Sequence, residues 1–265
     1  MPRYVVHRGG AALWPENTLL AFRNAIALGA RTLEFDVHGT ADGDVAVIHD
    51  PTVDRTTNGT GAVAGLTVAA LRGLRIRTRE GTLTDAWVPT LGEVLSLAAP
   101  AGVTLLVEIK TPGAAVGYER IGGVVKATPG ARYEGLEARV LARLREAGVV
   151  ERSILMAFNP AVVAEVRALA PRQMTALLVE RHHVEAAGAT STEPVAWAAR
   201  AGANFLGIHY AVCDAAMVAA ARAAGIALGV FTVNEETDLR RLAALGVDVI
   251  ISDRADLVAT LQGEQ

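Results

Sequence analysis

The sequence is poor in cysteine and in long apolar runs. Its single cysteine, Cys213, cannot form an intramolecular disulfide, and we expect it to be a packed thiol. Charge or glycine interrupts every apolar run well short of the ~18 residues of a spanning helix, so we expect no stable membrane insertion. The opening residues Met1-Pro2-Arg3 run directly into an apolar segment ending at His7, which is not a signal-peptide pattern. We therefore predict a cytoplasmic location.

An excess of positive charge is also missing. The chain has 25 Lys and Arg against 28 Asp and Glu, a formal net charge of -3, and its basic residues are scattered rather than grouped in blocks. Nucleic-acid-binding proteins usually carry a basic patch, so we expect no nucleic-acid partner. A small-molecule substrate is the better expectation, and no interface pattern indicates an oligomeric state.

The length and the alternation of patterns indicate the fold class. The chain has 265 residues, 51% of them apolar, and eight-stranded α/β barrels occupy ~250 residues as one domain. After residue 100, short β-branched or Leu-rich runs alternate with longer Ala-, Arg- and Glu-rich stretches of helical character. This alternation predicts right-handed crossovers and a parallel sheet. We predict a single domain, residues 1–265, with the TIM (β/α)8 barrel fold.

Eight strand and helix units are expected. The strands are predicted at 4–7, 32–37, 104–110, 153–158, 174–180, 205–210, 227–233 and 247–253, with an additional strand at 45–49 beside the second. The helices are predicted at about 17–28, 91–99, 134–147, 160–169, 193–201, 214–224, 235–244 and 254–261. Asn or Asp precedes several of these helices and Gly follows several, as is typical of helix caps.

Two stretches break the alternation. Residues 51–90 show little periodicity and are too long for an ordinary connection, so we predict a small inserted segment over the barrel mouth, after the second strand unit. Residues 111–133 are rich in glycine, and we predict a mobile loop after the third strand.

Glu34 and Asp36 lie two residues apart in the apolar run 32–37. A strand alternates its faces, so both carboxylates point the same way. Buried carboxylates repel each other and lose hydration, and the pair therefore needs a cation, a proton or a basic side chain.

Glu108 and Lys110 repeat this spacing on a second strand and add a third carboxylate to the same face. Three carboxylates form a set of hard oxygen ligands that suits Mg²⁺ or Ca²⁺. Structural salt bridges with Arg8 and Lys110 are the alternative, but they rarely need three acids for two bases. We predict a site for one divalent cation.

Two histidines lie at the ends of neighbouring apolar runs. His7 and His49 each stand where a strand gives way to a loop, and working residues of α/β barrels occupy the carboxyl ends of strands. With ordinary pKa values near ~6.5, one can take a proton and the other can give one. Arg8 and Lys110 beside a cation suit a phosphate anion. The sequence therefore predicts a phosphate compound as substrate.

Ordered motifs support this chemistry along the chain. They are His7-Arg8-Gly9, Pro15-Glu16-Asn17-Thr18, Ala21-Phe22, Glu34-Phe35-Asp36-Val37, Thr40, Asp42-Gly43, His49-Asp50, Arg55-Thr56-Thr57, Glu108-Ile109-Lys110, Thr232-Val233-Asn234, Gly246-Val247-Asp248 and Ser252-Asp253. In this order they closely resemble the glycerophosphodiester phosphodiesterase family over residues 4–257. The likeness is strongest to its short cytosolic bacterial enzymes.

The resemblance implies a TIM barrel with a segment inserted after the second strand unit. It implies hydrolysis of glycerophosphodiesters to sn-glycerol 3-phosphate and an alcohol such as choline, ethanolamine or glycerol. It also implies a role for each matching residue: metal binding by Glu34, Asp36 and Glu108, acid and base catalysis by His7 and His49, and phosphate binding by Arg8 and Lys110. Both attack by water and attack by the glycerol 2-hydroxyl on the phosphorus are compatible with these roles.

Departures from the family pattern lie outside this set. Thr111 stands between Lys110 and Pro112, and Phe231 takes a place where the family often has Trp. We expect Phe231 to give an apolar wall for the glycerol carbons, with plain barrel packing as an equal alternative. His209, at the end of the sixth strand, is a second candidate substrate contact, with a structural role as its alternative. His38 shares the face of Asp36 but is expected beyond the strand.

Two other functions fit the sequence. A lysophospholipase D acting on lysophospholipids needs an apolar channel for an acyl chain, and residues 51–90 and 111–133 hold few large apolar residues. A non-catalytic barrel that binds a phosphate ligand would have the same fold. The complete set of acids, bases and candidate ligands argues against it. The sequence indicates neither the head group nor the physiological metal.

Overall fold

Parallel strands close into a barrel in the computed structural model, which describes residues 1–263. In order around the barrel the strands are β1 (Arg3–Val6), β2 (Thr32–Gly39), β4 (Thr104–Ile109), β7 (Ser153–Ala157), β8 (Met174–Val179), β9 (Phe205–His209), β10 (Ala227–Phe231) and β11 (Val249–Ser252). Strand β1 pairs with both β11 and β2, which closes the sheet. The TIM-barrel fold predicted from the sequence is confirmed.

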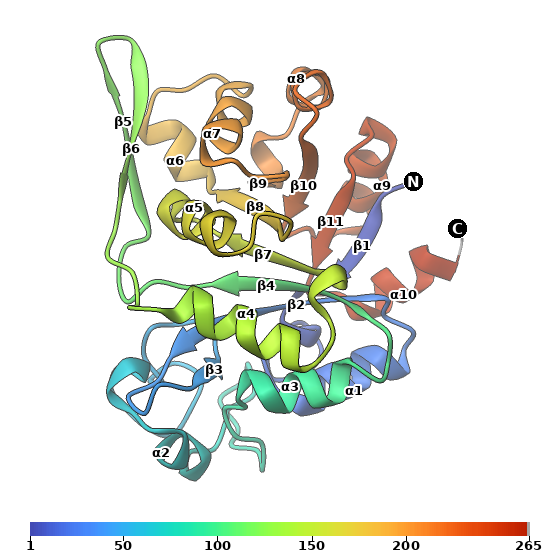
Figure 1. The fold of residues 1–265 in the computed structure, drawn as a ribbon. Helices are drawn as coiled ribbons and strands as arrows, with labels where there is room; N and C mark the ends of the chain where they lie inside the picture. The colour runs from blue at the N-terminus through green and yellow to red at the C-terminus, as the bar shows by residue number, and fades with distance from the viewer. Residues whose placement is uncertain (264–265) are drawn as a thin grey trace.

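Helices cover the outside of the barrel, except the short one at Val68–Gly73, which lies in the inserted segment (Figure 1). They are α1 (Leu19–Ala27), α2 (Val68–Gly73), α3 (Leu91–Ala98), α4 (Leu136–Glu146), α5 (Pro160–Leu169), α6 (Arg181–Ala186), α7 (Glu193–Ala201), α8 (Ala215–Ala223), α9 (Glu236–Leu245) and α10 (Ala255–Gly263). Caps fix several starts, since Asn159 accepts from the Ala161 amide at α5 and Asp214 accepts from the Met217 amide at α8. Among the helices of residues 1–263, none is long and apolar enough to cross a membrane.

Strand alternation divides the core into two layers. Outward side chains such as Leu33, Phe35 and Val37 of β2 pack against the surrounding helices. Inward side chains fill the barrel itself, including Val5, Leu106, Ile154, Met156, Leu178 and Ile251. Because inward positions repeat every second residue, the last inward residue of each strand emerges at the barrel mouth.

Residues 51–90 form an excursion with a small core of its own. It follows β3 (Val45–Val47), which pairs antiparallel with β2 and confirms the additional strand. Val53, Val63, Leu71 and Ile76 pack together within the segment and against Ile48. Helix α2 lies here and was not predicted, because six residues are too few to show helical periodicity.

The prediction of a mobile loop at 111–133 is wrong, because this segment contains a β-hairpin. Strands β5 (Val116–Ile121) and β6 (Val124–Pro129) pair antiparallel and stand clear of the barrel (Figure 1). Gly122 and Gly123, with φ of 58° and 82°, form the two-residue turn, a glycine pair that is itself a hairpin signal. Tyr118 anchors the hairpin by stacking on Trp197 of α7, with ring centroids 4.3 Å apart.

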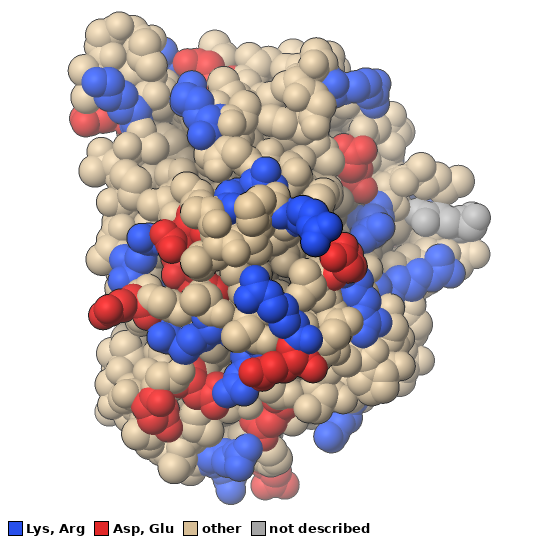
Figure 2. All heavy atoms as spheres, viewed as in Figure 1, with Lys and Arg blue, Asp and Glu red and all other residues tan. Residues whose placement is uncertain are grey.

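The surface is of mixed charge on the face seen in Figure 1. Basic and acidic side chains are interspersed there, without a continuous basic patch (Figure 2). Elsewhere in the described chain, charged residues one helical turn apart form ion pairs, such as Arg181 with Glu185 on α6 and Arg241 with Asp238 on α9. Exposed pairs of this kind contribute little to stability but keep a helix face solvated.

Candidate active site

Chemically active side chains meet where the barrel strands end. The inward positions are apolar in the depth of the barrel and become polar or aromatic at the carboxyl end. The polar or aromatic residues at inward positions near this end are His7, Asp36, Lys110, Phe158, Glu180, His209, Phe231 and Asp253. Strand β2 carries carboxylates at two successive inward positions, Glu34 and Asp36, and its next inward position is His38.

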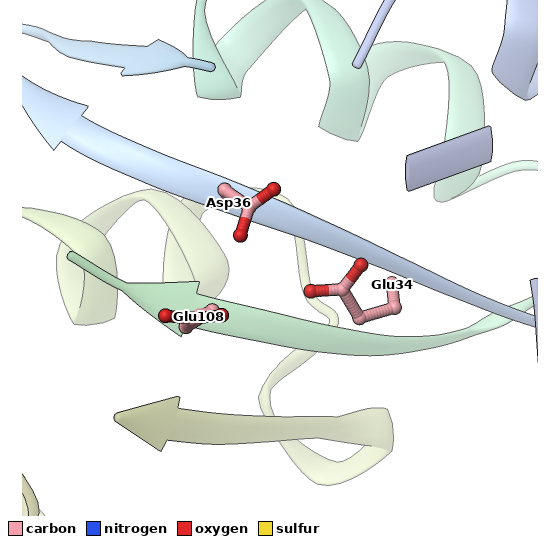
Figure 3. Close-up of side chains that lie close together, drawn as sticks. All are labelled: Glu34, Asp36 and Glu108. Carbon is pink, nitrogen blue, oxygen red and sulfur yellow. The ribbon is translucent and has the colours of Figure 1, made fainter. Parts of the chain in front are cut away.

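Three carboxylates from two neighbouring strands form the centre of the site. Asp36 of β2 lies directly opposite Glu108 of β4 in the strand register, and Glu34 lies one inward position deeper (Figure 3). Each residue offers one oxygen, and these three oxygens lie within 4.8 Å of one another. Glu34 is 2% exposed, Asp36 0% and Glu108 6%. The sequence prediction that these acids come together is confirmed.

Two cations and an amide surround Asp36. Lys110 Nζ lies 3.0 Å from Asp36 Oδ1 and 2.6 Å from Glu108 Oε1, and Arg8 Nε lies 3.2 Å from Asp36 Oδ2. Asn17 Nδ2 donates to Asp36 Oδ2 at 2.9 Å. Burial would raise the pKa of Asp36, but Lys110 and Arg8 outweigh burial and hold it well below its usual value. Asp36 is therefore ionised at neutral pH.

Glu34 is the least compensated of the three acids. Its Oε2 accepts from the Arg8 backbone amide at 3.1 Å and lies 3.7 Å from His7 Nε2. Burial first, and then repulsion by Asp36, raise the pKa of Glu34 well above its ordinary value. Burial likewise raises the pKa of Glu108 to about 7, against the attraction of Lys110.

The donor set fits a hard divalent cation. With all three carboxylates ionised their charge would be -3, against +2 on Arg8 and Lys110. The raised pKa values of Glu34 and Glu108 show that the metal-free cluster favours a proton, which a bound cation would replace. Asp36 Oδ1 is buried and, among residues 1–263, has no partner in hydrogen-bonding geometry, although Lys110 lies near it. Salt bridges thus account for part of the cluster and leave it in need of more positive charge. Oxygen ligands of this kind suit Mg²⁺ or Ca²⁺.

A strained turn delivers the Arg8 amide to Glu34. Arg8 has φ of 49°, in the left-handed region that non-glycine residues seldom occupy. Gly9 follows with φ of 80°, and a Cβ there would lie 2.7 Å from the Ala21 Cβ. The segment His7–Gly9 therefore packs tightly on α1, and this packing holds the Arg8 amide against the Glu34 carboxylate.

His7 belongs to a chain of polar groups at the end of β11. Its Nδ1 lies 2.6 Å from Asp253 Oδ1, and Asn234 Nδ2 donates to Asp253 Oδ2 at 2.8 Å. Burial opposes ionisation of Asp253, but the hydrogen bond from His7 lowers the pKa of this carboxyl below its usual value. The ionised Asp253 fixes the Nδ1–H tautomer, which leaves Nε2 free on the side of Glu34.

His49 has a similar carboxylate partner. Its Nδ1 lies 2.7 Å from Asp50 Oδ1, and Arg55 Nε donates to Asp50 Oδ2 at 2.6 Å. Burial lowers the pKa of His49 to about 4, and the nearby Lys110 acts in the same direction. Burial opposes ionisation of Asp50, yet Arg55 and His49 lower its pKa to about 2. The His49 imidazole is therefore neutral at pH 7 and able to accept a proton.

His38 lies behind His49. Contrary to the expectation that it lies beyond the strand, it is the seventh residue of β2 and is fully buried. Its Nε2 lies 3.0 Å from the His49 backbone oxygen and its Nδ1 lies 2.8 Å from the Tyr133 hydroxyl. Burial lowers the pKa of His38 to about 4. A neutral His38 thus donates to the backbone that carries His49.

Two cavities share His7 and Arg8 in their walls. The smaller cavity measures about 80 Å³. Its other charged or titratable lining residues are Glu34, His49, Glu108, Lys110 and Glu180, and the rest of its wall is formed by Met156, Phe158, Leu178, Phe231, Thr232 and Ile251. The larger measures about 470 Å³ and is lined mainly by polar residues of the segments 14–16, 55–56 and 77–79, with Asn234 and Asp253. The smaller cavity contains every group that the sequence assigned to catalysis or metal, except Asp36.

The two further substrate contacts expected from the sequence differ in their positions. Phe231 lines the smaller cavity and packs edge-to-face on Phe158, with ring centroids 5.9 Å apart. His209 packs edge-to-face on Phe231, with ring centroids 6.3 Å apart, and lines neither of the two cavities. Its Nδ1 accepts from the Ala211 amide at 3.3 Å, a capping role. The geometry therefore favours the structural alternative for His209.

Several partners were not assigned from the sequence. Asp253 and Asp50 orient the two histidines, and Asn17 holds Asp36. Glu16 joins the first loop to the excursion, since it accepts from Arg8 and from Arg55. All of these residues belong to the ordered motifs, so the sequence marked them as candidates. It did not indicate which of them pair with one another, because most of the partners lie far apart in the chain.

Known proteins match the chain over nearly its whole length. The sequence model of the glycerophosphoryl diester phosphodiesterase family matches residues 7–257. A glycerophosphodiester phosphodiesterase of Caldanaerobacter subterraneus is 32% identical over 97% of this chain and 96% of its own. The crystal structure of a glycerophosphodiester phosphodiesterase from Agrobacterium tumefaciens is 26% identical, covers 98% of this chain and 100% of its own, and superposes with a TM-score of 0.76.

A more distant neighbour shows the same fold. A phosphodiesterase of Oleispira antarctica, solved in complex with the product sn-glycerol 3-phosphate, is 24% identical. It covers 99% of this chain and 96% of its own, with a TM-score of 0.75.

Proposed function

The chain belongs to the glycerophosphoryl diester phosphodiesterase family, and we propose that it hydrolyses glycerophosphodiesters to sn-glycerol 3-phosphate and an alcohol. One observation carries the proposal most directly. A buried carboxylate cluster with a deficit of positive charge lies beside two histidines, each held by its own aspartate. A phosphate-binding scaffold without activity needs no such paired acid and base groups.

We propose that Glu34, Asp36 and Glu108 hold one divalent cation, Mg²⁺ or Ca²⁺. When bound, such a cation polarises phosphoryl oxygens and stabilises the charge that develops on them. Lys110 lies between Asp36 and Glu108 and lines the smaller cavity, which supports a contact of its ammonium group with a phosphoryl oxygen. Arg8 contributes a guanidinium at the junction of the two cavities, where the phosphate group would lie.

The two histidines take different roles in the proposal. His49 lines the smaller cavity but not the larger one. Because its imidazole is neutral at pH 7, it takes the proton of the attacking oxygen. His7 lines both cavities, and Asp253 on its Nδ1 supports the imidazolium form, which would give its Nε2 proton to the alcohol oxygen as the phosphorus–oxygen bond breaks. In-line displacement requires these groups on opposite sides of the phosphorus, and the lining of different cavities by His7 and His49 supports this division of roles.

The cavity walls support a small, water-soluble diester over a lysophospholipid. The larger cavity beside the catalytic histidines is lined by arginine, glutamate and threonine side chains, with Trp14 as its only large aromatic group. An acyl chain is stabilised only by burial against apolar surface, and these walls offer little of it.

The cytoplasmic location and the assignment of residues 1–265 to one domain stay proposals from the sequence.

The test is product identity. The protein is incubated with glycerophosphocholine and Mg²⁺ or Ca²⁺, and glycerol 3-phosphate is followed with a coupled dehydrogenase while free choline is measured in parallel. We expect equal amounts of glycerol 3-phosphate and choline. Release of phosphocholine and glycerol would show cleavage of the other ester bond and contradict the proposal, as would no turnover with either metal.

A further inference from the structure

The cavity of about 470 Å³ is larger than a simple alcohol such as choline requires, and it is strongly basic. Four arginines line it: Arg8, Arg55, Arg77 and Arg79. Its two carboxylates are Glu16 and Asp253. The cavity adjoins the catalytic groups directly, because His7 and Arg8 also line the smaller cavity.

The charges of two of these arginines are already satisfied. Glu16 Oε1 lies 3.2 Å from Arg8 Nη1 and 2.8 Å from Arg55 Nη2, and Arg55 also binds Asp50. Asp253 is engaged by His7 and Asn234. These groups form the floor of the cavity and hold the excursion against the first loop.

Arg77 and Arg79 are different, because no carboxylate of residues 1–263 forms an ion pair with either of them. Arg77 Nε donates to the Thr57 backbone oxygen at 3.0 Å, and Nη1 donates to the Gly81 backbone oxygen at 3.2 Å. These bonds to neutral carbonyls fix the guanidinium in place without removing its charge. Arg79 is exposed at the rim of the same cavity. The wall formed by residues 77–79 thus places two guanidinium groups on one cavity. Arg77 has no acidic partner among the described residues, and the neighbouring Glu80 only partly offsets the charge of Arg79, with which it forms no ion pair.

The smaller cavity is narrower and less basic. Glu34, Glu108 and Glu180 line it beside Arg8, Lys110 and apolar residues, and its volume of about 80 Å³ suits a glycerol group rather than a second, phosphorylated group. In the orientation that this favours, the glycerol would lie in the smaller cavity and the departing alcohol in the larger one, on the side of His7. This orientation also gives His7 the leaving oxygen.

We propose that the larger cavity is a subsite for a leaving alcohol that carries its own phosphomonoester group, with Arg77 and Arg79 as its ligands. Guanidinium groups bind phosphate through paired, charge-assisted hydrogen bonds, and a group fixed in advance loses less entropy on binding. The inference rests on the proposed hydrolysis and adds the substrate class to it: glycerophosphodiesters whose head group is itself phosphorylated.

The test uses two substrates that differ only by that phosphate, glycerophosphoinositol and glycerophosphoinositol 4-phosphate. The ratio of their kcat/KM values, from release of glycerol 3-phosphate at low ionic strength, is the phosphate preference. We expect the wild-type preference to exceed 1 and to fall when salt is raised, because salt screens exposed charges. Arg79→Gln and Arg77→Gln should each lower it about two- to fivefold, which is the effect expected from losing one exposed ion pair.

Arg75→Gln is the matched control. Arg75 lies in the same excursion, is exposed, donates to the backbone oxygens of Arg72 and Leu74, and does not line the cavity. Its substitution should leave both kcat/KM values unchanged. Because Arg77 also holds the turn at Gly81, Arg79→Gln is the decisive variant if Arg77→Gln fails to fold.

The outcomes separate the two claims. If the wild type hydrolyses both substrates with equal kcat/KM, or if Arg79→Gln keeps the wild-type preference, the subsite is refuted and the hydrolase function stands. If the wild type hydrolyses neither of these substrates nor glycerophosphocholine, the proposed function fails and the subsite fails with it.

Discussion

Glu34→Gln separates a metal site from a structural salt-bridge cluster. The substitution keeps the shape of the side chain and an oxygen that can accept from the Arg8 amide, but it removes the least compensated charge of the cluster. A carboxyl whose pKa is raised by folding destabilises the fold at pH values above its unfolded pKa, because ionisation is disfavoured in the folded state. We therefore expect the metal-free variant to melt no lower than metal-free wild type at pH 7.5.

The response to metal should change in the opposite direction. For wild type at a metal concentration of about 100 times Kd, ligand binding adds roughly 2.7 kcal/mol to the free energy of unfolding. In a chain of this size that is a rise of about 5 to 10 °C in Tm. Removing one buried charged ligand weakens binding by about a hundredfold or more. At the same metal concentration the gain then falls to about 0.4 kcal/mol, or roughly 1 °C.

The assay is thermal unfolding of chelator-treated protein with and without Mg²⁺ or Ca²⁺. Glu146→Gln is the control, since Glu146 is exposed on α4 and pairs only with Arg143 among the described residues. It should keep the full metal-induced rise in Tm. An equal rise in Glu34→Gln and wild type would refute Glu34 as a ligand. A lower Tm of the metal-free variant would show that the cluster is a structural ion-pair network.

Three further predictions concern the catalytic groups and buried histidines. His49→Ala should lower kcat about 10²- to 10⁴-fold by loss of the base, while the metal-induced rise in Tm persists; loss of that rise would make His49 a ligand. Glu108→Ala should lose metal binding and activity together, and retained metal binding would mean that its role is different. His183 is a buried residue of α6 that packs on Tyr118. Burial lowers the pKa of His38 and of His183 to about 4, so the unfolded chain binds protons first as pH falls below 6.5. Each of these two histidines should lower the free energy of unfolding by roughly 2 kcal/mol at pH 5. Urea unfolding at pH 7 and pH 5 should show that His183→Asn loses less stability between these pH values than wild type does, by about half of the combined contribution of the two histidines. An equal loss in the variant and in wild type would contradict this account of His183.

The barrel and its central acids followed from local patterns. Alternation of faces placed Glu34 and Asp36 together, and the ends of apolar runs placed His7 and His49 at the mouth. These inferences need only the period of a strand and the rule that working groups lie at the carboxyl ends of barrel strands. The predicted positions of these side chains are correct because each depends only on where the residue lies within one strand.

What the sequence did not reveal depends on contacts between distant segments. Asp253 pairs with His7 across 246 residues, and no local pattern indicates such a pair. The same is true of Glu16, whose bonds to Arg55 join the first loop to the excursion. The hairpin at 116–129 was missed for another reason, because its glycines were taken as a mark of irregularity although Gly122-Gly123 is a turn between two strands.

Hydrolysis is expected to depend on a cation held by the buried carboxylates Glu34, Asp36 and Glu108. This dependence is measured as the initial rate of glycerophosphocholine hydrolysis by chelator-treated wild type while Mg²⁺ or Ca²⁺ is titrated back. We predict no turnover without metal and a rate that rises with the same midpoint as the metal-induced increase in Tm. Full turnover in the metal-free protein, or activation at a midpoint unrelated to the change in Tm, would contradict the account.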